Sequence, residues 1–140
     1  MQAELRSNCQ TVAGDLDQIQ QRAPLVVEAY RNRLLERLNK LLEQYEVTLE
    51  AADVVREVAI LVDRSDISEE LARLRSHLEQ FETIVGGPES NGRKLEFLIQ
   101  EMFREANTIG SKANDSEIAR RAIDIKVAIE RMKEMIQNVE

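Results

Sequence analysis

The stretch "DISEELARLRSHLEQFETIV", residues 66–85, decides the fold. Its apolar side chains recur at alternating intervals of four and three residues. They are Ile67, Leu71, Leu74, Leu78, Phe81 and Val85. Such intervals place the apolar residues on one narrow stripe of an α-helix, which is the heptad seam of helices that pack at shallow angles. Asp66 supplies an N-cap side chain and Glu69 completes a capping-box-like pair, so we expect the helix to begin here.

The same seam recurs on the N-terminal side of this stretch. A first helix carries it at Leu5, Cys9, Val12, Leu16 and Ile19. We expect Pro24 to open a second helix, because a proline in the first helical turn needs no backbone N–H. Residues 46–50 then connect the second helix to a third helix over residues 51–63.

On the C-terminal side, "GGPESNG" at residues 86–92 is the strongest break and predicts a loop. A fifth helix is expected from residue 93 to residue 107. It ends within "REANTIGSK", residues 104–112, where Gly110 is suited to a left-handed turn.

A last helix starts at an N-cap supplied by Asn114 or Asp115. Its apolar stripe comprises Ile118, Ala122, Ile125, Ile129, Met132, Ile136 and Val139. The whole pattern predicts an all-α fold of long antiparallel helices in hairpins or a bundle, with coiled-coil-like seams. Because a narrow seam buries less area than the face of a globular helix, we expect the protein to be an oligomer.

Composition agrees with this fold class. With 140 residues the chain has the length of one domain, and only 4% of its residues are aromatic, which makes a β-sandwich or barrel improbable. The net charge of −7 excludes a surface that binds polyanions everywhere, so any nucleic-acid site must be a local basic patch. No apolar run has the length of a membrane span or the form of a signal peptide, which predicts a cytoplasmic protein without membrane contact.

Several familiar chemistries are missing from the sequence. There is no CxxC, HExxH, GxSxG or glycine-rich phosphate loop. Cys9 lies at a seam position without a basic neighbour, so we expect a small core residue rather than a nucleophile. His77 is the single histidine and the one obvious general base near neutral pH. A histidine at the edge of a seam is also commonly a packed residue, and both interpretations stay open.

The fifth helix has an unusual outer face. On a helical wheel, one arc opposite the apolar stripe holds Arg93, Phe97, Gln100, Arg104 and Asn107. One interpretation is contact with nucleic acid, in which the arginines bind phosphates and Phe97 stacks on an unpaired base. In the other, Phe97 packs on a neighbouring helix and the charges are solvated.

Glu101 and Glu105 lie one turn apart and flank this arc. Two such carboxylates are suited to one Mg²⁺ or Mn²⁺ ion, which commonly takes one or two carboxylates together with water and phosphate oxygens. Asp63 and Glu69 would add ligands only if the fold brings them near. An acidic pair without an ion is the competing interpretation.

Three segments carry a resemblance to a known family. "RSHLEQF" (75–81), "GRKLEFLIQEMFREANTIGSK" (92–112) and "IERMKEMIQNVE" (129–140), in this order and spacing, resemble the YicC/YloC-type proteins. These are bacterial proteins described as stress-induced and as endoribonucleases. The resemblance is strong over residues 55–140. One departure is Phe103, where many members have asparagine.

The resemblance implies a cytoplasmic, ring-forming hydrolase that cuts single-stranded RNA with help from a divalent cation, and it gives no reason to expect DNA binding. It makes His77, Glu101 and Glu105 the candidates for catalysis, with Glu101 and Glu105 as metal ligands. The candidates for RNA binding, together with Phe97 from the wheel, are Arg75, Arg93, Lys94, Arg104, Asn107 and Lys112.

Members of the family are about twice this length, so the resemblance implies that the family's N-terminal domain is absent from this chain. We accordingly expect a helical arm over residues 1–54 and the family's C-terminal helical domain over residues 55–140. Two functions stay open. The chain is either the RNA-binding, oligomerising part of an endoribonuclease, inactive alone if its site is shared with the other domain, or an inert helical scaffold whose polar face contacts another subunit or domain.

Overall fold

Five α-helices make up the part of the chain that the computed structural model describes, residues 2–87 and 91–139, and no strand occurs in it. They are α1 (Gln2–Gln44), α2 (Ala51–Ser65), α3 (Ser68–Gly86), α4 (Gly92–Lys112) and α5 (Ser116–Val139). The predicted all-helical class is confirmed. None of the described helices is both long and apolar enough to cross a membrane.

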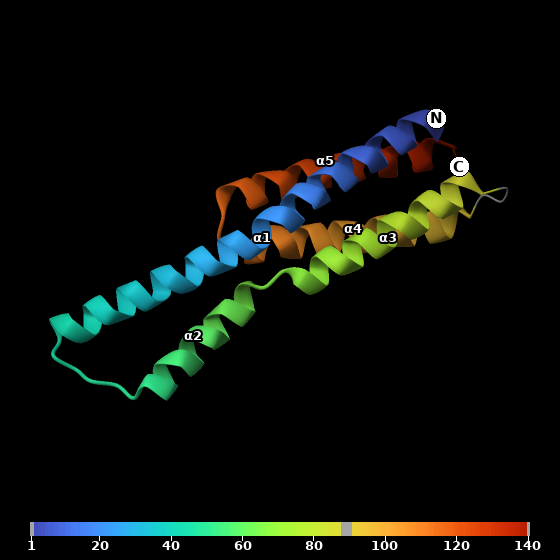
Figure 1. Ribbon diagram of the computed structural model, residues 1–140. Coiled ribbons are helices and arrows are strands. Elements are labelled where there is room, and N and C mark those ends of the chain that lie inside the picture. The colour runs from blue at the N-terminus through green and yellow to red at the C-terminus, as the bar shows by residue number, and fades with distance from the viewer. Residues whose placement is uncertain (1, 88–90, 140) are drawn as a thin grey trace.

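The first part of α1 and helices α3, α4 and α5 form a bundle in which each helix packs against two neighbours. Consecutive members run in opposite directions, so the bundle is elongated (Figure 1). The predicted seams face inward and form one continuous apolar core. Its largest fully buried side chains include Leu16, Ile19, Leu74, Phe81 and Met132. The apolar positions predicted in the first part of α1, in α3 and in α5 are accordingly buried, except that Val85 is half-buried and the side chain of Val139 lies outside the described residues.

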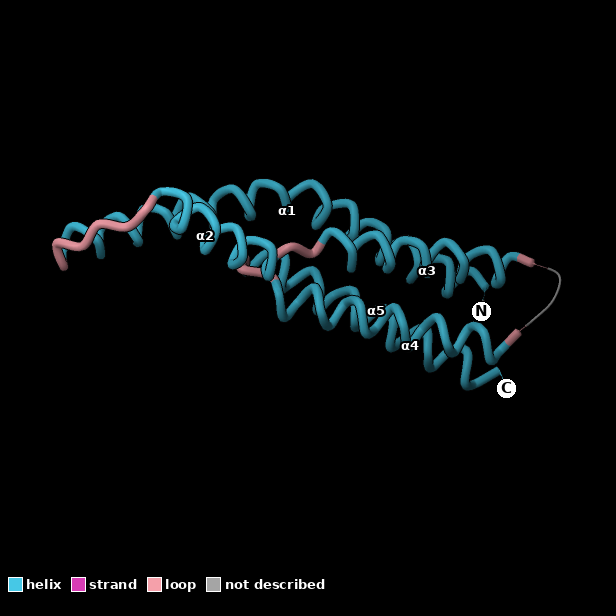
Figure 2. Tube along the Cα trace, turned by 90° about the horizontal axis from the view of Figure 1, so that it is seen from below, coloured by secondary structure: helices cyan, strands magenta, loops and turns pink. Residues whose placement is uncertain are grey.

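Helix α1 continues beyond the bundle. Its 43 residues correspond to about 65 Å, and its buried positions end at Ile19. The remainder of α1 packs with α2, and the two helices project from one end of the bundle (Figures 1 and 2). We call this projection, residues 24–65, the arm. The predicted division of the chain into domains at residue 54 stays a prediction, although residues 5–19 share the bundle core.

The prediction of a helix break before Pro24 is wrong. Pro24 lies inside α1, so the chain has one helix where two were expected. Proline removes one hydrogen bond of the helix and costs stability, but Ala23 and Val26 on either side of it pack against the bundle core. Tertiary packing across the proline explains why α1 continues.

The predicted end of α4 is also wrong. The helix runs to Lys112, five residues past the expected end at residue 107. Gly110 does not adopt a left-handed conformation, since no described glycine has a positive φ angle. A Cβ at this position would lie 3.6 Å from the Cβ of Ala122. Helices α4 and α5 thus approach closely here, and "REANTIGSK" is helical throughout.

Helix starts were predicted in part. Asp115 caps α5, since its carboxylate accepts a hydrogen bond from the backbone N–H of Ile118 at 3.0 Å. The prediction of Asp66 as the N-cap of α3 is wrong, because the N-cap is Ile67, which makes no side-chain cap hydrogen bond. Asp66 lies one residue earlier and accepts a hydrogen bond from the backbone N–H of Ser68 at 2.9 Å. Glu69 does not complete the expected capping box, because the N–H of Asp66 donates to the carbonyl of Asp63. Of the expected loop 86–92, residues 88–90 lie outside the described residues.

An ion pair ties α1 to the start of α5. The guanidinium of Arg22 donates to both carboxylate oxygens of Asp115, at 2.6 and 2.9 Å. The hydrogen bond from Arg22 is the largest of several effects that lower the pKa of Asp115. The pair therefore holds the two helices together at the end of the bundle where the arm begins.

We expect Asp115→Asn to destabilise the protein at neutral pH, and the difference from wild type to shrink in acid. The pKa of Asp115 is lower in the folded protein than in the unfolded chain. Such a carboxylate stabilises the fold fully above its unfolded pKa of about 3.9. The contribution is lost as the pH falls through the lower, folded pKa. Urea unfolding of both proteins across the acidic range measures this difference, and asparagine keeps an N-cap acceptor.

The unfolding free energies of wild type and variant must be subtracted at each pH, because Asp15 makes stability depend on pH in the opposite direction. Burial raises the pKa of Asp15 despite a hydrogen bond from Arg121, so the fold gains relative stability from Asp15 as the carboxylate is protonated. Wild type and variant share that contribution. A difference in unfolding free energy that stays constant from neutral to strongly acidic pH would contradict the role given to Asp115.

Candidate functional site

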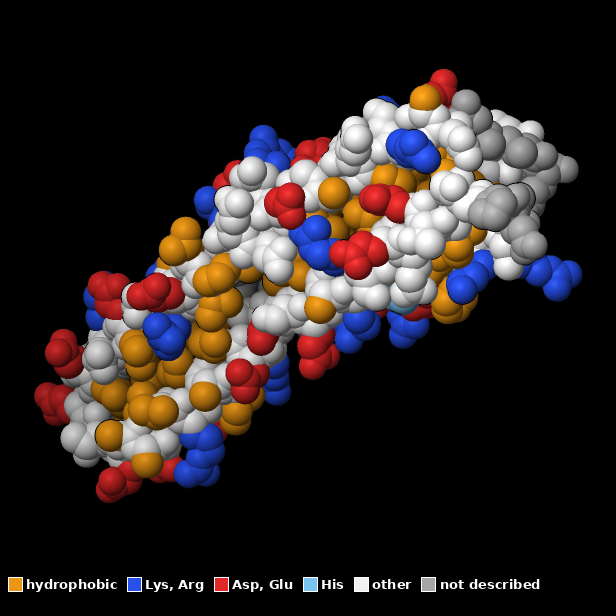
Figure 3. Space-filling view, turned by 45° about the vertical axis from the view of Figure 1, so that its right-hand side comes forward, with side chains coloured by type: hydrophobic (Ala, Val, Ile, Leu, Met, Phe, Trp, Pro, Cys, Tyr) orange, Lys and Arg blue, Asp and Glu red, His pale blue; other side chains and the backbone are white. Residues whose placement is uncertain are grey.

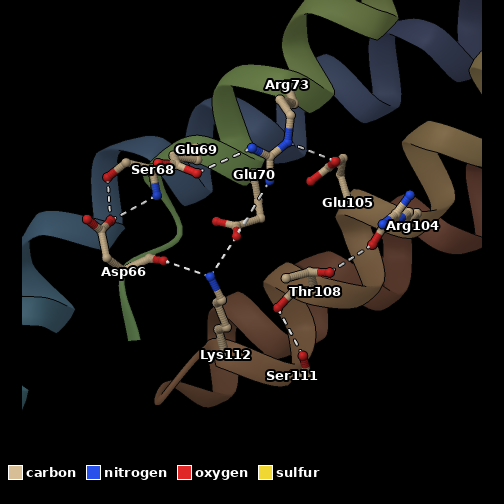
Figure 4. A network of polar contacts seen from close by, with 10 residues as sticks. All are labelled: Asp66, Ser68, Glu69, Glu70, Arg73, Arg104, Glu105, Thr108, Ser111 and Lys112. Atoms are coloured by element: carbon tan, nitrogen blue, oxygen red, sulfur yellow. Dashed lines mark hydrogen bonds and ion pairs between the residues drawn. The ribbon is translucent and has the colours of Figure 1, made fainter. Parts of the chain in front are cut away.

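A network of charged side chains joins α3 to α4 (Figure 4). The Nε of Arg73 on α3 donates to Oε1 of Glu105 on α4 at 2.9 Å. Glu105 is only 6% exposed, whereas the side chain of Arg73 is 48% exposed. Because a buried carboxylate is costly unless it is paired, this contact fixes Glu105 against α3.

Glu70 makes the second contact between these helices. It is 4% exposed, and its Oε1 accepts a hydrogen bond from Nζ of Lys112 at 2.7 Å. The same Nζ lies 3.5 Å from the backbone oxygen of Asp66. Lys112 reaches Glu70 only because α4 continues to its full length. The Oε2 atom of Glu70 is buried without a hydrogen-bond partner among the described residues.

The register of the two helices places His77 level with Glu101. They are antiparallel, and Arg73 on α3 lies opposite Glu105 on α4. One turn further along α3 is His77, and one turn back along α4 is Glu101. His77 is half-buried, and its Nδ1 is buried with no hydrogen-bond partner in the described part of the chain. No contact of His77 therefore fixes which ring nitrogen carries the proton.

Glu101 is the more accessible of the two predicted metal ligands. Its side chain is 26% exposed, and Oε1 lies 3.9 Å from Nη1 of Arg104. Within the described residues, no three histidine, cysteine or acidic side chains are grouped closely enough to hold a metal ion. The carboxylate pair fits one divalent cation only if Arg73 releases Glu105, since the guanidinium already neutralises that carboxylate. The metal site stays a prediction.

The outer face of α4 carries the predicted arc, which we call the α4 arc: Arg93, Phe97, Gln100, Arg104 and Asn107. All five residues are exposed. Phe97 is 55% exposed, so it does not pack into this chain's core. Asn107 accepts a hydrogen bond from Nζ of Lys126 at 3.1 Å, which adds an α5 cation to the arc.

Three predicted RNA-binding residues, Arg75, Lys94 and Lys112, lie away from the α4 arc, and Lys112 belongs to the network through Glu70. Arg75 faces α1, where its Nη2 donates to Asp17 at 2.6 Å and to Gln20 at 3.1 Å. Lys94 lies on another side of α4 and lines a small groove with side chains of α3, among them Thr83. The structure thus brings together some of the predicted residues and separates others, because residues one or two positions apart on a helix point in different directions.

Cys9 is a core residue, as the sequence predicted. It is 2% exposed, and burial, with a smaller effect of Glu82, raises the pKa of its thiol to about 12. The thiolate is therefore absent at neutral pH, and Cys9 does not act as a nucleophile.

Sequence reasoning gave no role to Glu70 or Arg73, which the structure places in the network. Each is adjacent to a seam residue, Glu70 to Leu71 and Arg73 to Leu74. Charges that flank a seam are the ones that meet the neighbouring helix, and this was the available signal. Phe103, the departure from the family pattern, packs against the core.

Fold and site together define a class: an all-helical domain in which a charged interhelical network adjoins an exposed helix face of arginines and an aromatic ring. A family model described as "Endoribonuclease YicC-like, C-terminal" matches residues 19–140. The chain belongs to this family, as the resemblance of its sequence predicted.

Two relatives show the extent of the similarity. The chain is 37% identical to a protein named probable endoribonuclease YicC from Clostridioides difficile (strain 630), over 98% of this chain and 46% of the relative. It is 35% identical to a protein of the same name from Haemophilus influenzae, over 97% of this chain and 46% of the relative. The chain therefore spans about half the length of the curated relatives it matches.

We expect Lys112→Met to destabilise the protein by about 1–3 kcal/mol, because Glu70 would keep a buried carboxylate without its closest cation. Replacing Glu70 with leucine as well removes that carboxylate, so the double variant is expected to regain part of the loss. Urea unfolding of the two single variants and the double variant measures the coupling.

Lys133→Met is the matched control. Lys133 lies 3.9 Å from Glu130, and both side chains are about half exposed. We expect a change within about 0.5 kcal/mol for this surface pair. Equal effects of Lys112→Met and Lys133→Met would show that the network between α3 and α4 does not stabilise the fold.

Proposed function

We propose that this chain is the RNA-binding part of a divalent-cation-dependent endoribonuclease that acts on single-stranded RNA, and that it works as a homo-oligomer together with a domain corresponding to the remaining half of its relatives. Membership of an endoribonuclease family supports the reaction type. The observation that carries the RNA contact is Phe97, which is 55% exposed between arginines on the α4 arc.

Binding is assigned to the α4 arc. Its arginines neutralise phosphates, and the exposed ring of Phe97 is suited to stacking on an unpaired base, which a duplex does not offer. This combination favours single strands. Arg75 and Lys94 lie on other sides of the bundle, so any contact with the same strand requires the strand to pass around α3. Lys112 acts mainly within the network, through Glu70.

Catalysis is assigned to the side of the α3–α4 pair where His77 is level with Glu101. Cleavage of a phosphodiester needs a group that removes a proton from the attacking oxygen, and His77 is suited to this near neutral pH. Glu101 and Glu105 would hold Mg²⁺ or Mn²⁺, with Glu105 exchanging its contact to Arg73. When bound, the ion would neutralise charge that develops on the phosphate.

A second function is supported by exposed apolar side chains on the arm. Leu25, Tyr45 and Val55 are 67%, 67% and 64% exposed, and hydrophobic side chains gather over the arm in Figure 3. A scaffold that joins copies of the chain would cover such side chains. The scaffold and the nuclease are compatible, but only the nuclease requires His77 and Glu101.

To test catalysis, we expect His77→Gln and Glu101→Gln each to lower the rate of RNA cleavage about 100-fold or more. The assay incubates the chain with labelled single-stranded RNA and Mn²⁺ and separates the products on denaturing gels. Glu134→Gln, an exposed change on α5, serves as the control and leaves cleavage unchanged. Absence of both cleavage and RNA retention by the wild-type chain would support the scaffold instead.

The α4 arc is tested by two variants with different signatures. Arg104→Ala removes one phosphate contact, so the slope of log affinity against log salt becomes shallower by about 0.7. Phe97→Ala weakens binding by about 1–3 kcal/mol and leaves the salt slope unchanged. Ile123→Ala is the matched control for Phe97, because Ile123 is also 55% exposed but lies on α5. Identical binding by all three variants would exclude the arc as the RNA contact.

A further inference from the structure

A groove on the arm is lined mainly by one face of α1. Its volume is ≈ 700 Å³. The lining residues are Tyr30, Arg33, Leu34, Glu36, Arg37, Lys40 and Leu41, with Asn114 from the connection between α4 and α5. We call this the arm groove. None of its residues belongs to the site described above, and it lies at the other end of α1 from the bundle core.

The arm groove is basic on an acidic protein. Residues 30–41 contain four basic side chains, Arg31, Arg33, Arg37 and Lys40, and one acidic side chain, Glu36, which gives four minus one, or +3. The whole chain carries −7. A polyanion is therefore repelled by most of the surface and attracted to this segment.

The cations of the arm groove are available to a ligand. In the described part of the chain, Arg33, Arg37 and Lys40 have no carboxylate within ion-pairing distance. Arg22 in the same helix is paired with Asp115, and Arg75 is paired with Asp17. Arg22 and Arg75 therefore join helices, whereas the cations of the arm groove face outward along the arm.

The spacing of these side chains forms a linear track. Tyr30, Arg33, Arg37 and Lys40 fall within an arc of about 80° on the helix and extend over about 15 Å of its length. Three cations in a row follow a chain of phosphates, and the half-buried ring of Tyr30 at one end offers a surface on which a base can stack. A compact anion would need the three cations to converge on one point, and a row does not provide that.

We propose that the arm groove is a second binding track for single-stranded RNA, with phosphates on Arg33, Arg37 and Lys40 and a base on Tyr30. The assignment of RNA as the ligand rests on the proposed function. Asn114 lies two residues after the end of α4, so a strand in the arm groove is adjacent to the helix that carries the α4 arc. The arm then captures RNA and the α4 arc receives the same strand.

The experiment measures binding of the chain to a fluorescein-labelled oligouridylate by anisotropy, over a series of salt concentrations. We expect the triple variant Arg33→Gln/Arg37→Gln/Lys40→Gln to bind at least about 10-fold more weakly at low salt. Its salt slope becomes shallower by about 2, since each phosphate contact to a single strand contributes about 0.7. Tyr30→Leu weakens binding at an unchanged slope, and it keeps the arm's charge.

The matched control is Arg56→Gln/Arg64→Gln/Arg131→Gln, which removes the same charge from exposed positions outside the groove. Its salt slope is expected to stay close to that of the wild type. Equal loss of affinity in the two triple variants would overturn the proposal, because total charge rather than the track would then determine binding. An unchanged salt slope in the arm variant would also overturn it. If the arm variant binds RNA as the wild type does but has a different sedimentation coefficient, the proposal is overturned as well, and the groove is a contact between copies of the chain.

The two proposals fail in distinguishable ways. If the arm variant binds RNA weakly while Phe97→Ala and Arg104→Ala bind normally, the result supports the arm groove as an RNA contact and excludes the α4 arc. If the arm variant binds like the wild type while the α4 variants and Glu101→Gln lose binding or cleavage, the arm groove is excluded and the proposed function stands.

Discussion

The structure depends on burial of the first part of α1, which packs directly against α3 and α5 in the core of the bundle. Val12, Leu16 and Ile19 are at most 1% exposed, and they belong to a core that α3, α4 and α5 complete. Each helix presents only a narrow apolar stripe, so a single helix on its own would not be stable. The stripes form a core only when the four helices pack together.

This core sets the distance between α3 and α4 and thereby creates the charged network. Glu70 and Glu105 flank the apolar seam, so packing of the seam removes them from water. Their carboxylates need partners there, and Lys112 and Arg73 supply them across the interface. The same packing leaves the opposite face of α4 in solvent, where its arginines and aromatic ring are available for a ligand. One helix therefore has a structural face and a face suited to binding.

Most of the arm lies beyond the core, although Val26 near its start still packs against the core. Beyond the bundle, α1 packs mainly with α2, and cations and several apolar side chains of the arm remain exposed. We propose RNA as the ligand of the basic groove and another subunit or domain as the partner of the exposed apolar residues.

The sequence by itself determined the features that depend on local periodicity and local hydrogen bonding. The interval pattern located the buried stripes, the pair of capping candidates Asn114 and Asp115 located the start of α5, and the seam position of Cys9 predicted an inert core thiol. The family was evident from its sequence segments. The exposed arc on α4 also followed from the wheel, since the direction of each side chain on a helix is set by 3.6 residues per turn.

Only the tertiary structure decided the features that depend on long-range packing. Pro24 and Gly110 are local signals for helix ends, but α1 continues through Pro24 and α4 continues through Gly110. Packing against neighbouring helices stabilises both helices on either side of these residues. The metal site at Glu101 and Glu105 stays a prediction, but nothing in the sequence indicated that the buried carboxylate of Glu105 would lie against Arg73 on another helix. A sequence gives the face on which a side chain lies. It does not give the neighbour that the face meets, because that neighbour is fixed by the free energy of burying all the stripes at once.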